Sequence, residues 1–186
     1  MWRIFMGMAF LSTGLLPAHG FAEGETMDGT MQMEAFDSAH FQFDGPMGER
    51  IRANLEHWLL RAPGANPNML EMFYRRDRHL PYPTPVPWAG EFAGKYLISA
   101  VQALRMTDDA RLRALLESFT AGLMAAQDED GYLGPWPKHE RLLTHWDLWG
   151  HYHVMLGLML WHDATGDPKA LSCARRMADC VCDVYP

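Results

Sequence analysis

Hydrophobic and polar positions alternate at helical spacing through most of the chain after residue 40. Between residues 46 and 61 the apolar positions that fall on one helical face are Ile51, Leu55, Trp58 and Leu59. This spacing predicts a first helix over about 46–61, and Pro63-Gly64 ends it. Asn68 is then expected to be the N-cap of a short helix that runs to Tyr74.

Residues 79–88 interrupt the helical pattern with four prolines. Proline lacks the amide donor that a helix or a central strand needs, so this stretch is expected to be extended. It carries Tyr82 near its start and Trp88 at its end. Long irregular segments are often functional, but a rigid surface connection is an equally good interpretation.

Helical spacing then returns and predicts four longer helices, over about 88–105, 109–127, 144–164 and 168–184. The second of these is expected to bury Leu112, Leu115, Leu116, Phe119 and Leu123. The fourth is expected to turn Leu171, Ala174, Ala178 and Val181 inward.

The first two of these helices match the last two as a repeat. Trp88 and Trp146 are 58 positions apart, as are Thr107 and Thr165, while Gly94-Lys-Tyr and Gly150-His-Tyr are 56 apart. A period of this length marks stacked helical hairpins. In each hairpin the first helix is more apolar and the second more charged, which is typical of inner and outer helices in an α/α toroid. The sequence therefore predicts an all-α fold.

Composition narrows the functional classes. The chain has 186 residues, 48% of them hydrophobic, and a formal net charge of −7. This length suits one domain with a substantial core. Acidic and basic residues are interspersed, without the basic patch that binding to a phosphate backbone requires, so nucleic acid is not expected as a partner.

Residues 1–22 have the pattern of a signal peptide. Arg3 precedes a mostly apolar stretch over 4–16, and Gly20 and Ala22 supply the small residues of a cleavage site. We therefore expect export to the periplasm or the extracellular space, with no membrane contact beyond the export signal. An uncleaved anchor is the alternative. Residues 23–40 are polar and Met-rich and are expected to be flexible, and residues 41–186 are expected to be the N-terminal part of a helical domain.

All three cysteines, Cys173, Cys180 and Cys182, lie near the end of the sequence. Cys173 and Cys180 are two helical turns apart, too far to form a disulfide within one helix. A Cys-x-Cys pair without further ligands is a weak metal signal, so packed thiols are expected.

The side chains that could bind a ligand are concentrated in residues 145–167, HWDLWGHYHVMLGLMLWHDATGD. Aromatic faces beside hydrogen-bonding side chains suit a sugar, which stacks its C–H face and pairs its hydroxyl groups. The candidate substrate-binding residues are Trp88, Glu91, His145, Trp146, Asp147, His151 and His153. The alternative is that this cluster is hydrogen-bonded core. Tyr132 and Trp136 in the preceding loop are likewise either a stacking platform or packing.

Glu91 and Asp147 open two pseudo-equivalent helices. If these helices run in the same direction, the two carboxylates lie at one end of the toroid and could face a common cleft. Glycoside cleavage uses two carboxyl groups, so they are candidate catalytic residues, although sugar binding or dipole compensation is the stronger interpretation. His151 and His153 lie about 200° apart around a helix and cannot share a metal ion, so no metal site is expected.

The series of motifs resembles glycoside hydrolase family 127, the β-L-arabinofuranosidase-like catalytic domain. Its elements are Trp88-x-Gly-Glu-x-x-Gly-x-Tyr-Leu, Gln127-Asp-x-Asp-Gly-Tyr-Leu-Gly, Trp146-Asp-Leu-Trp-x-His, Gly157-Leu and Ala164-Thr-Gly-Asp. The resemblance covers about residues 41–184 and implies part of an (α/α)6 barrel. His151 and Trp88-x-Gly-Glu91 correspond to residues near the sugar. Lys95 departs from the family, which often has His at this position.

The resemblance also implies retaining hydrolysis by a zinc-bound cysteine thiolate, with a glutamate as general acid. The terminal cysteines do not occupy the family's positions, so zinc is expected only in a full-length domain and the catalytic residues beyond Pro186. An open apolar flank is expected to favour self-association. Two alternatives remain: a non-catalytic helical module that binds glycans or a protein, and another (α/α)6 sugar enzyme that uses aspartates.

Overall fold

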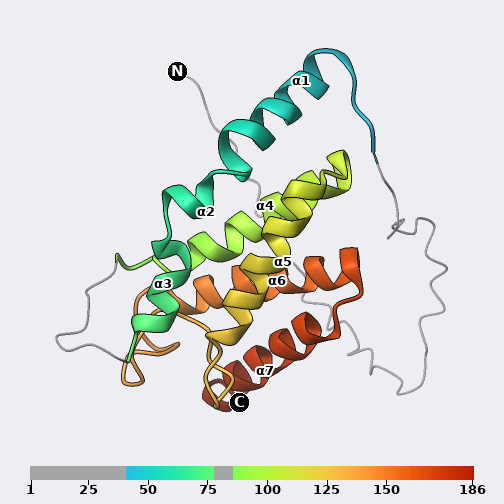
Figure 1. Ribbon diagram of the computed structural model, residues 1–186. Coiled ribbons are helices and arrows are strands. Elements are labelled where there is room, and N and C mark those ends of the chain that lie inside the picture. Colours follow the sequence, from blue (N-terminus) through green and yellow to red (C-terminus); the bar gives the residue numbers. More distant parts are fainter. Residues whose placement is uncertain (1–40, 78–85) are drawn as a thin grey trace, which may run out of the picture. The chain divides into compact units, whose positions relative to one another are not determined.

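The computed structural model describes residues 41–77 and 86–186, and every regular element in these ranges is a helix (Figure 1). The predicted all-α class is therefore confirmed. The elements are α1 (Gly45–Asn54), the π-helical turn η1 (Leu55–Leu59), α2 (Ala62–Ala65), α3 (Asn68–Arg75), α4 (Glu91–Thr107), α5 (Ala110–Ala125), α6 (Asp147–Thr165) and α7 (Pro168–Val184). The predicted signal peptide, the segment 23–40 and most of the proline-rich stretch lie outside the described residues.

The first predicted helix is present but changes its winding at Leu55. The amide of Leu60 donates to the carbonyl of Leu55, an i to i+5 bond of 3.1 Å that marks a π-helical turn. The extra residue per turn shifts the phase of the helix. Leu59 is therefore buried, whereas Trp58 is 56% exposed, and the prediction that Trp58 faces the core is wrong.

The prediction that Asn68 caps α3 is also wrong. Pro67 already has helical dihedrals and holds the capping position, and Asn68 is the first residue of the helix. Proline fixes φ near the helical value and needs no amide partner in a first turn, so the chain enters the helix one residue early.

The two predicted hairpins are α4–α5 and α6–α7, and their turns repeat in detail. Asp108 ends α4 in the left-handed conformation, and Gly166 ends α6 in the same way. The carboxylate of Asp109 then caps α5, and that of Asp167 caps α7. Both pairs are 58 positions apart, the period found in the sequence.

Helices α4 and α6 run parallel and side by side (Figure 1). A side chain at Gly90 would approach Gly150, one at Gly94 would strike His153, and Gly157 lies against Leu97, so the contacts advance together along both helices. A Cβ atom at Gly94 would lie 2.3 Å from the carbonyl carbon of His153, so glycine is required for this close approach. Helix α5 packs against α4, and α7 packs against α6 and α5.

The inward face of α7 differs from the prediction. Its buried residues are Ala170, Cys173, Ala174 and Met177. Leu171 is half-buried and Ala178 is exposed. Ala174 is buried as predicted and Val181 is half-buried, but the buried face is centred on Ala170, Cys173 and Met177, one residue before the predicted stripe. Small or apolar residues occupy both stripes, so periodicity alone did not distinguish them.

The main core joins the inward faces of α3 to α7 with Leu55 and Leu59. A smaller buried cluster of Tyr132, Trp136 and Leu142 lies under the loop between α5 and α6. That loop leads to the beginning of α6, three residues later than predicted because His145 has a positive φ of 57°. Among the described residues, no helix has the length and hydropathy needed to cross a membrane.

Candidate functional site

The N-terminal ends of α4 and α6 lie side by side, as the repeat predicts. The amide of Trp146 donates to the carbonyl of Pro87 at 3.0 Å and ties the two helix entrances together. The rings of Trp88 and Trp146 meet edge to face with centroids 6.4 Å apart. Both rings remain about half exposed, so each keeps a face that can contact a ligand.

The carboxylate of Glu91, in the first turn of α4, is the centre of a polar cluster at this end. The indole N–H of Trp149 donates to one oxygen, and the ammonium group of Lys95 lies 2.8 Å from the other. Lys95 also lies 5.8 Å from the Trp149 ring centroid. We call Glu91, Lys95, Trp149 and His153 the Glu91 cluster.

His153 packs against Trp149 one helical turn further along α6. Its ring packs edge-on against the indole with centroids 4.6 Å apart, and its Nδ1 lies 2.9 Å from the Trp149 carbonyl oxygen. His153 is buried, whereas Trp149 and the neighbouring Tyr152 are about half exposed. The cluster therefore presents a fixed aromatic surface next to a carboxylate and an ammonium group, a combination that suits a sugar ring.

Asp147 is held by a separate set of partners. Its side chain is buried and accepts hydrogen bonds from the Tyr132 hydroxyl and from the Leu142 amide, the latter at 2.7 Å. Burial raises the pKa of Asp147 to about 6, against the opposing effect of these hydrogen bonds. The carboxylate thus fastens the α5–α6 loop to the start of α6.

His151, which the resemblance places near the sugar, is 1% exposed. Its ring lies 5.1 Å from that of Tyr132, and neither ring nitrogen has a hydrogen-bond partner among the described residues. Burial, together with the positive charges of Arg141 and Arg76, lowers the pKa of His151 to about 4. The imidazole is therefore neutral at ordinary pH.

Of the remaining aromatic candidates, His145 is exposed, whereas Tyr132 and Trp136 are buried. His145 stacks on Trp136 with centroids 3.9 Å apart, and its Nε2 lies 3.3 Å from Glu140. Tyr132 and Trp136 are both buried, so of the two interpretations of this pair the structure favours packing over a stacking platform.

An ion cluster that the sequence did not predict holds the same loop. The guanidinium group of Arg141 contacts Asp77, Asp128 and Asp130 at 2.6–2.8 Å and lies 4.3 Å from the Tyr132 ring centroid. Asp77 is 64 positions away from Arg141 in the sequence, and no local sequence pattern predicts this contact. Arg141 thus gives both aspartates of the Asp128-x-Asp130 motif a cationic partner.

The zinc thiolate that the family resemblance implies does not fit these cysteines. Burial raises the pKa of Cys173 to about 11 and also raises that of Cys180, which disfavours thiolates. Within residues 41–77 and 86–186, no group of three or more His, Cys, Asp and Glu side chains could hold a metal ion.

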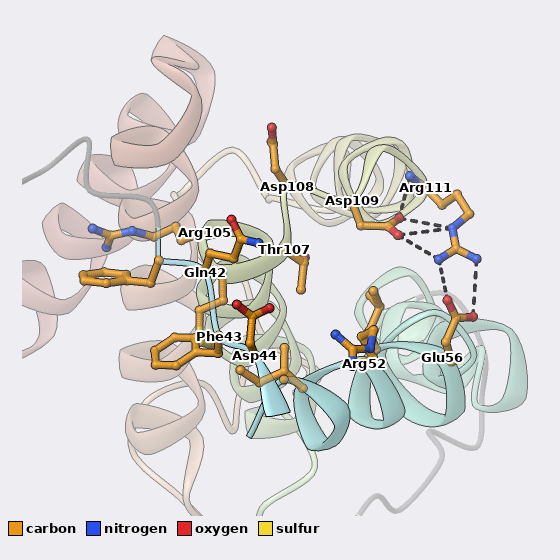
Figure 2. A pocket seen from close by; sticks show the side chains of 15 residues that line it. Gln42, Phe43, Asp44, Arg52, Glu56, Arg105, Thr107, Asp108, Asp109 and Arg111 are labelled. Carbon is orange, nitrogen blue, oxygen red and sulfur yellow. Dashed lines mark hydrogen bonds and ion pairs between the residues drawn. The ribbon is translucent and has the colours of Figure 1, made fainter. Parts of the chain in front are cut away.

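A cavity of about 610 Å³ lies at the other end of α4, about 24 Å from Glu91 along the helix. Figure 2 shows that Arg111 joins Asp109 to Glu56 across this cavity. These charges pair with one another and link the start of η1 to the start of α5. None of the predicted site residues lines this cavity.

Trp149 and Lys95 are the members of the Glu91 cluster that the candidate list omitted. Their signal was present in the repeat, because Glu91 and Trp149 are 58 positions apart, like Trp88 and Trp146. In parallel neighbouring helices, residues one period apart lie at the same height. The repeat therefore places Trp149 at about the level of Glu91, although it does not say which side chains face each other.

Comparisons with known proteins agree with this architecture. Residues 44–186 match the family model described as β-L-arabinofuranosidase, GH127 catalytic domain. A non-reducing end β-L-arabinofuranosidase from Bifidobacterium longum subsp. longum is 30% identical over 98 residues, 47% of this chain and 15% of the relative. A solved structure described as a GH127 β-arabinofuranosidase superposes with a TM-score of 0.65 at 23% identity, over 79% of this chain and 26% of that one.

Proposed function

The chain belongs to the family of β-L-arabinofuranosidase GH127 catalytic domains, and we propose that it binds the sugar of a β-L-arabinofuranoside at the paired N-terminal ends of α4 and α6. Its helices are part of the (α/α)6 barrel of glycoside hydrolases. The chain spans 15% of the length of the curated relative and 26% of the solved structure. We therefore also propose, as a further step, that the protein hydrolyses such glycosides.

The observation that carries the proposal is the Glu91 cluster, at the same helix ends as the half-exposed pair of Trp88 and Trp146. Trp149 offers an aromatic face to the C–H side of a furanose ring, and its indole N–H is already bonded to Glu91. Glu91 and Lys95 offer an acceptor and a donor for sugar hydroxyl groups. Trp88 and Trp146 would contact the next sugar or the aglycone.

We assign no nucleophile or general acid to the described residues. Both oxygens of Glu91 have partners, and Asp147 is buried under the α5–α6 loop. This favours sugar binding over direct catalysis for both carboxylates. The thiolate and zinc of the family reaction are proposed to belong to parts of the catalytic domain other than these residues. A non-catalytic glycan-binding role is the second candidate, favoured by the same engagement of Glu91.

We further propose that the protein is exported by the segment 1–22, because of its charged start, apolar stretch and small residues at the cleavage position. Expression in a Gram-negative host with N-terminal sequencing of the periplasmic product tests this. The expected first residue is Glu23. Retention of Met1 on a cytoplasmic product would contradict export.

The proposed function is tested with p-nitrophenyl β-L-arabinofuranoside and a panel of other aryl glycosides. We expect saturable binding of the arabinofuranoside, with slow or no release of p-nitrophenol. Turnover that Glu91→Gln abolishes would instead make Glu91 a catalytic residue. A folded, helical protein that neither binds nor cleaves any member of the panel would overturn the proposal.

A further inference from the structure

The cavity at the C-terminal end of α4 has an aromatic wall that the proposed sugar site does not use. The rings of Phe41 and Phe43 stack with centroids 6.4 Å apart, and they are 53% and 41% exposed. Both residues precede α1 and line the cavity (Figure 2). Its volume of about 610 Å³ is within the range of small-molecule sites.

Three backbone features hold these two rings in place. The amide of Phe41 donates to the carbonyl of Arg105 in the last turns of α4 at 3.4 Å. Gly45 has a positive φ of 59°, which turns the chain into α1. A Cβ atom at Gly48 would collide with the carbonyl oxygen of Phe43, so glycine is required where α1 passes that residue. The aromatic wall is therefore positioned by contacts with two helices.

The polar side chains of the cavity are of two kinds. At one edge, Arg111 is already paired with the two carboxylates that flank it (Figure 2). Gln42, Asp44 and Arg52 also line the cavity, and their side chains have no hydrogen-bond or ion-pair partner in the described part of the chain. An amide, a carboxylate and a guanidinium group thus lie beside the two rings with their hydrogen-bonding capacity unused.

This set of groups favours an uncharged ligand that is rich in hydroxyl groups. The whole lining has three arginines and four acidic residues, so it has almost no net charge to attract an ion. A hydroxyl group both donates and accepts hydrogen bonds, and the set offers acceptors on Asp44, donors on Arg52 and both on Gln42. Exposed ring faces beside such groups suit the C–H face of a sugar.

We propose that this cavity is a second carbohydrate-binding site, which takes a neutral sugar unit of a polysaccharide. It lies about 24 Å from Glu91 along α4, so the two sites hold different sugar units. The residues that line it all lie within 41–56 and 105–111 and include no member of the Glu91 cluster. The inference therefore does not depend on the proposed function.

Affinity electrophoresis tests the proposal, in native gels that contain soluble arabinan, arabinogalactan, arabinoxylan or glucomannan. The starting protein is the full chain with Trp149→Leu, because this substitution weakens the proposed site at the other end of α4. We expect at least one polysaccharide to retard it. Adding Phe43→Ala should then raise the dissociation constant about tenfold. Adding Trp58→Ala, at an exposed aromatic residue outside the cavity, should leave it unchanged.

The outcomes distinguish this site from the site at Glu91. Loss of all retardation with Trp149→Leu alone would overturn the second site and leave the proposed function standing. Retardation of the unsubstituted chain that Phe43→Ala removes and Trp149→Leu leaves intact would support the second site and count against the proposed function. Equal effects of Phe43→Ala and Trp58→Ala, or no retardation by any of the four polysaccharides, would also overturn the second site.

Salt dependence tests the chemical class of the ligand. A neutral sugar should bind equally well in about 0.05 M and about 0.5 M NaCl, because it forms no ion pair that salt can screen. Binding that weakens with salt, and for which inorganic phosphate competes, would show an anion site and contradict a site for neutral sugars.

Discussion

The indole N–H of Trp149 donates a hydrogen bond to the carboxylate of Glu91, which stands one repeat period earlier in the chain. This bond joins equivalent positions of two neighbouring inner helices. It fixes the plane of a half-exposed aromatic ring beside a carboxylate and an ammonium group. The proposed sugar site depends on this fixed orientation.

The Glu91–Trp149 bond is expected to contribute measurably to stability. A double-mutant cycle with Glu91→Gln and Trp149→Phe should give a coupling free energy of about 1 kcal/mol, because the acceptor is charged but the indole is partly in water. Urea denaturation of the four proteins measures it. The exposed pair Glu71–Arg75 is the control, with an expected coupling below about 0.5 kcal/mol. Equal couplings at the two sites would contradict a structural role for the bond.

Gly94→Ala should strongly destabilise the protein, by about 3 kcal/mol or more, because the new methyl group would enter the backbone of His153. Gly64→Ala is the matched control in α2, where a Cβ atom meets nothing within 4 Å. It should be neutral or stabilising by up to about 1 kcal/mol. Thermal denaturation of both variants checks the pair. A fully stable Gly94→Ala variant would mean that α4 and α6 are not in close contact.

Arg141→Met should destabilise the α5–α6 loop by about 3 kcal/mol, since three aspartates would lose a shared and largely buried guanidinium partner. The exposed pair of Arg113 with Asp108 provides the comparison, where Arg113→Met should cost less than about 1 kcal/mol. Hydrogen exchange of residues 128–146 should increase in the first variant alone. Unchanged protection of this loop would be inconsistent with the Arg141 cluster.

Asp147 and His151 should give opposite pH dependences in the same range. The pKa of Asp147 is raised to about 6, so between pH 4 and 6 the folded state keeps a proton that the unfolded state releases, and stability falls as pH rises. The pKa of His151 is lowered to about 4, so between pH 4 and 6.5 the unfolded state binds the additional proton, and stability rises with pH.

Each substitution should therefore leave the pH dependence of stability that the other residue causes. Asp147→Asn should leave a stability that rises from pH 4 to 6.5, and His151→Phe one that falls from pH 4 to 6, each by up to about 3 kcal/mol relative to the unsubstituted chain. Denaturant unfolding at pH 4, 5, 6 and 7 measures the two curves. Parallel curves for the two variants would show that these groups do not titrate as their burial requires.

The hairpins, their turns and the adjacency of Trp88 and Trp146 were predictable because they follow from local periodicity and one repeat. The π-turn at Leu55 was not, because nothing in the stripe distinguishes it from an ordinary helix. The contact of Arg141 with Asp77 and the burial of His151 depend on where the α5–α6 loop folds back. Such long-range packing leaves no periodic pattern in a single sequence, so the contact of the His151 ring with Tyr132 could not be predicted.

The most direct test of the account is the binding of methyl β-L-arabinofuranoside by titration calorimetry, with Trp149→Leu compared with Trp58→Leu. Both tryptophans are about half exposed, but only Trp149 belongs to the Glu91 cluster. We expect Trp149→Leu to raise the dissociation constant about tenfold and Trp58→Leu to leave it unchanged. Absence of binding by the unsubstituted chain, or an equal loss in both variants, would contradict a sugar site at the paired ends of α4 and α6.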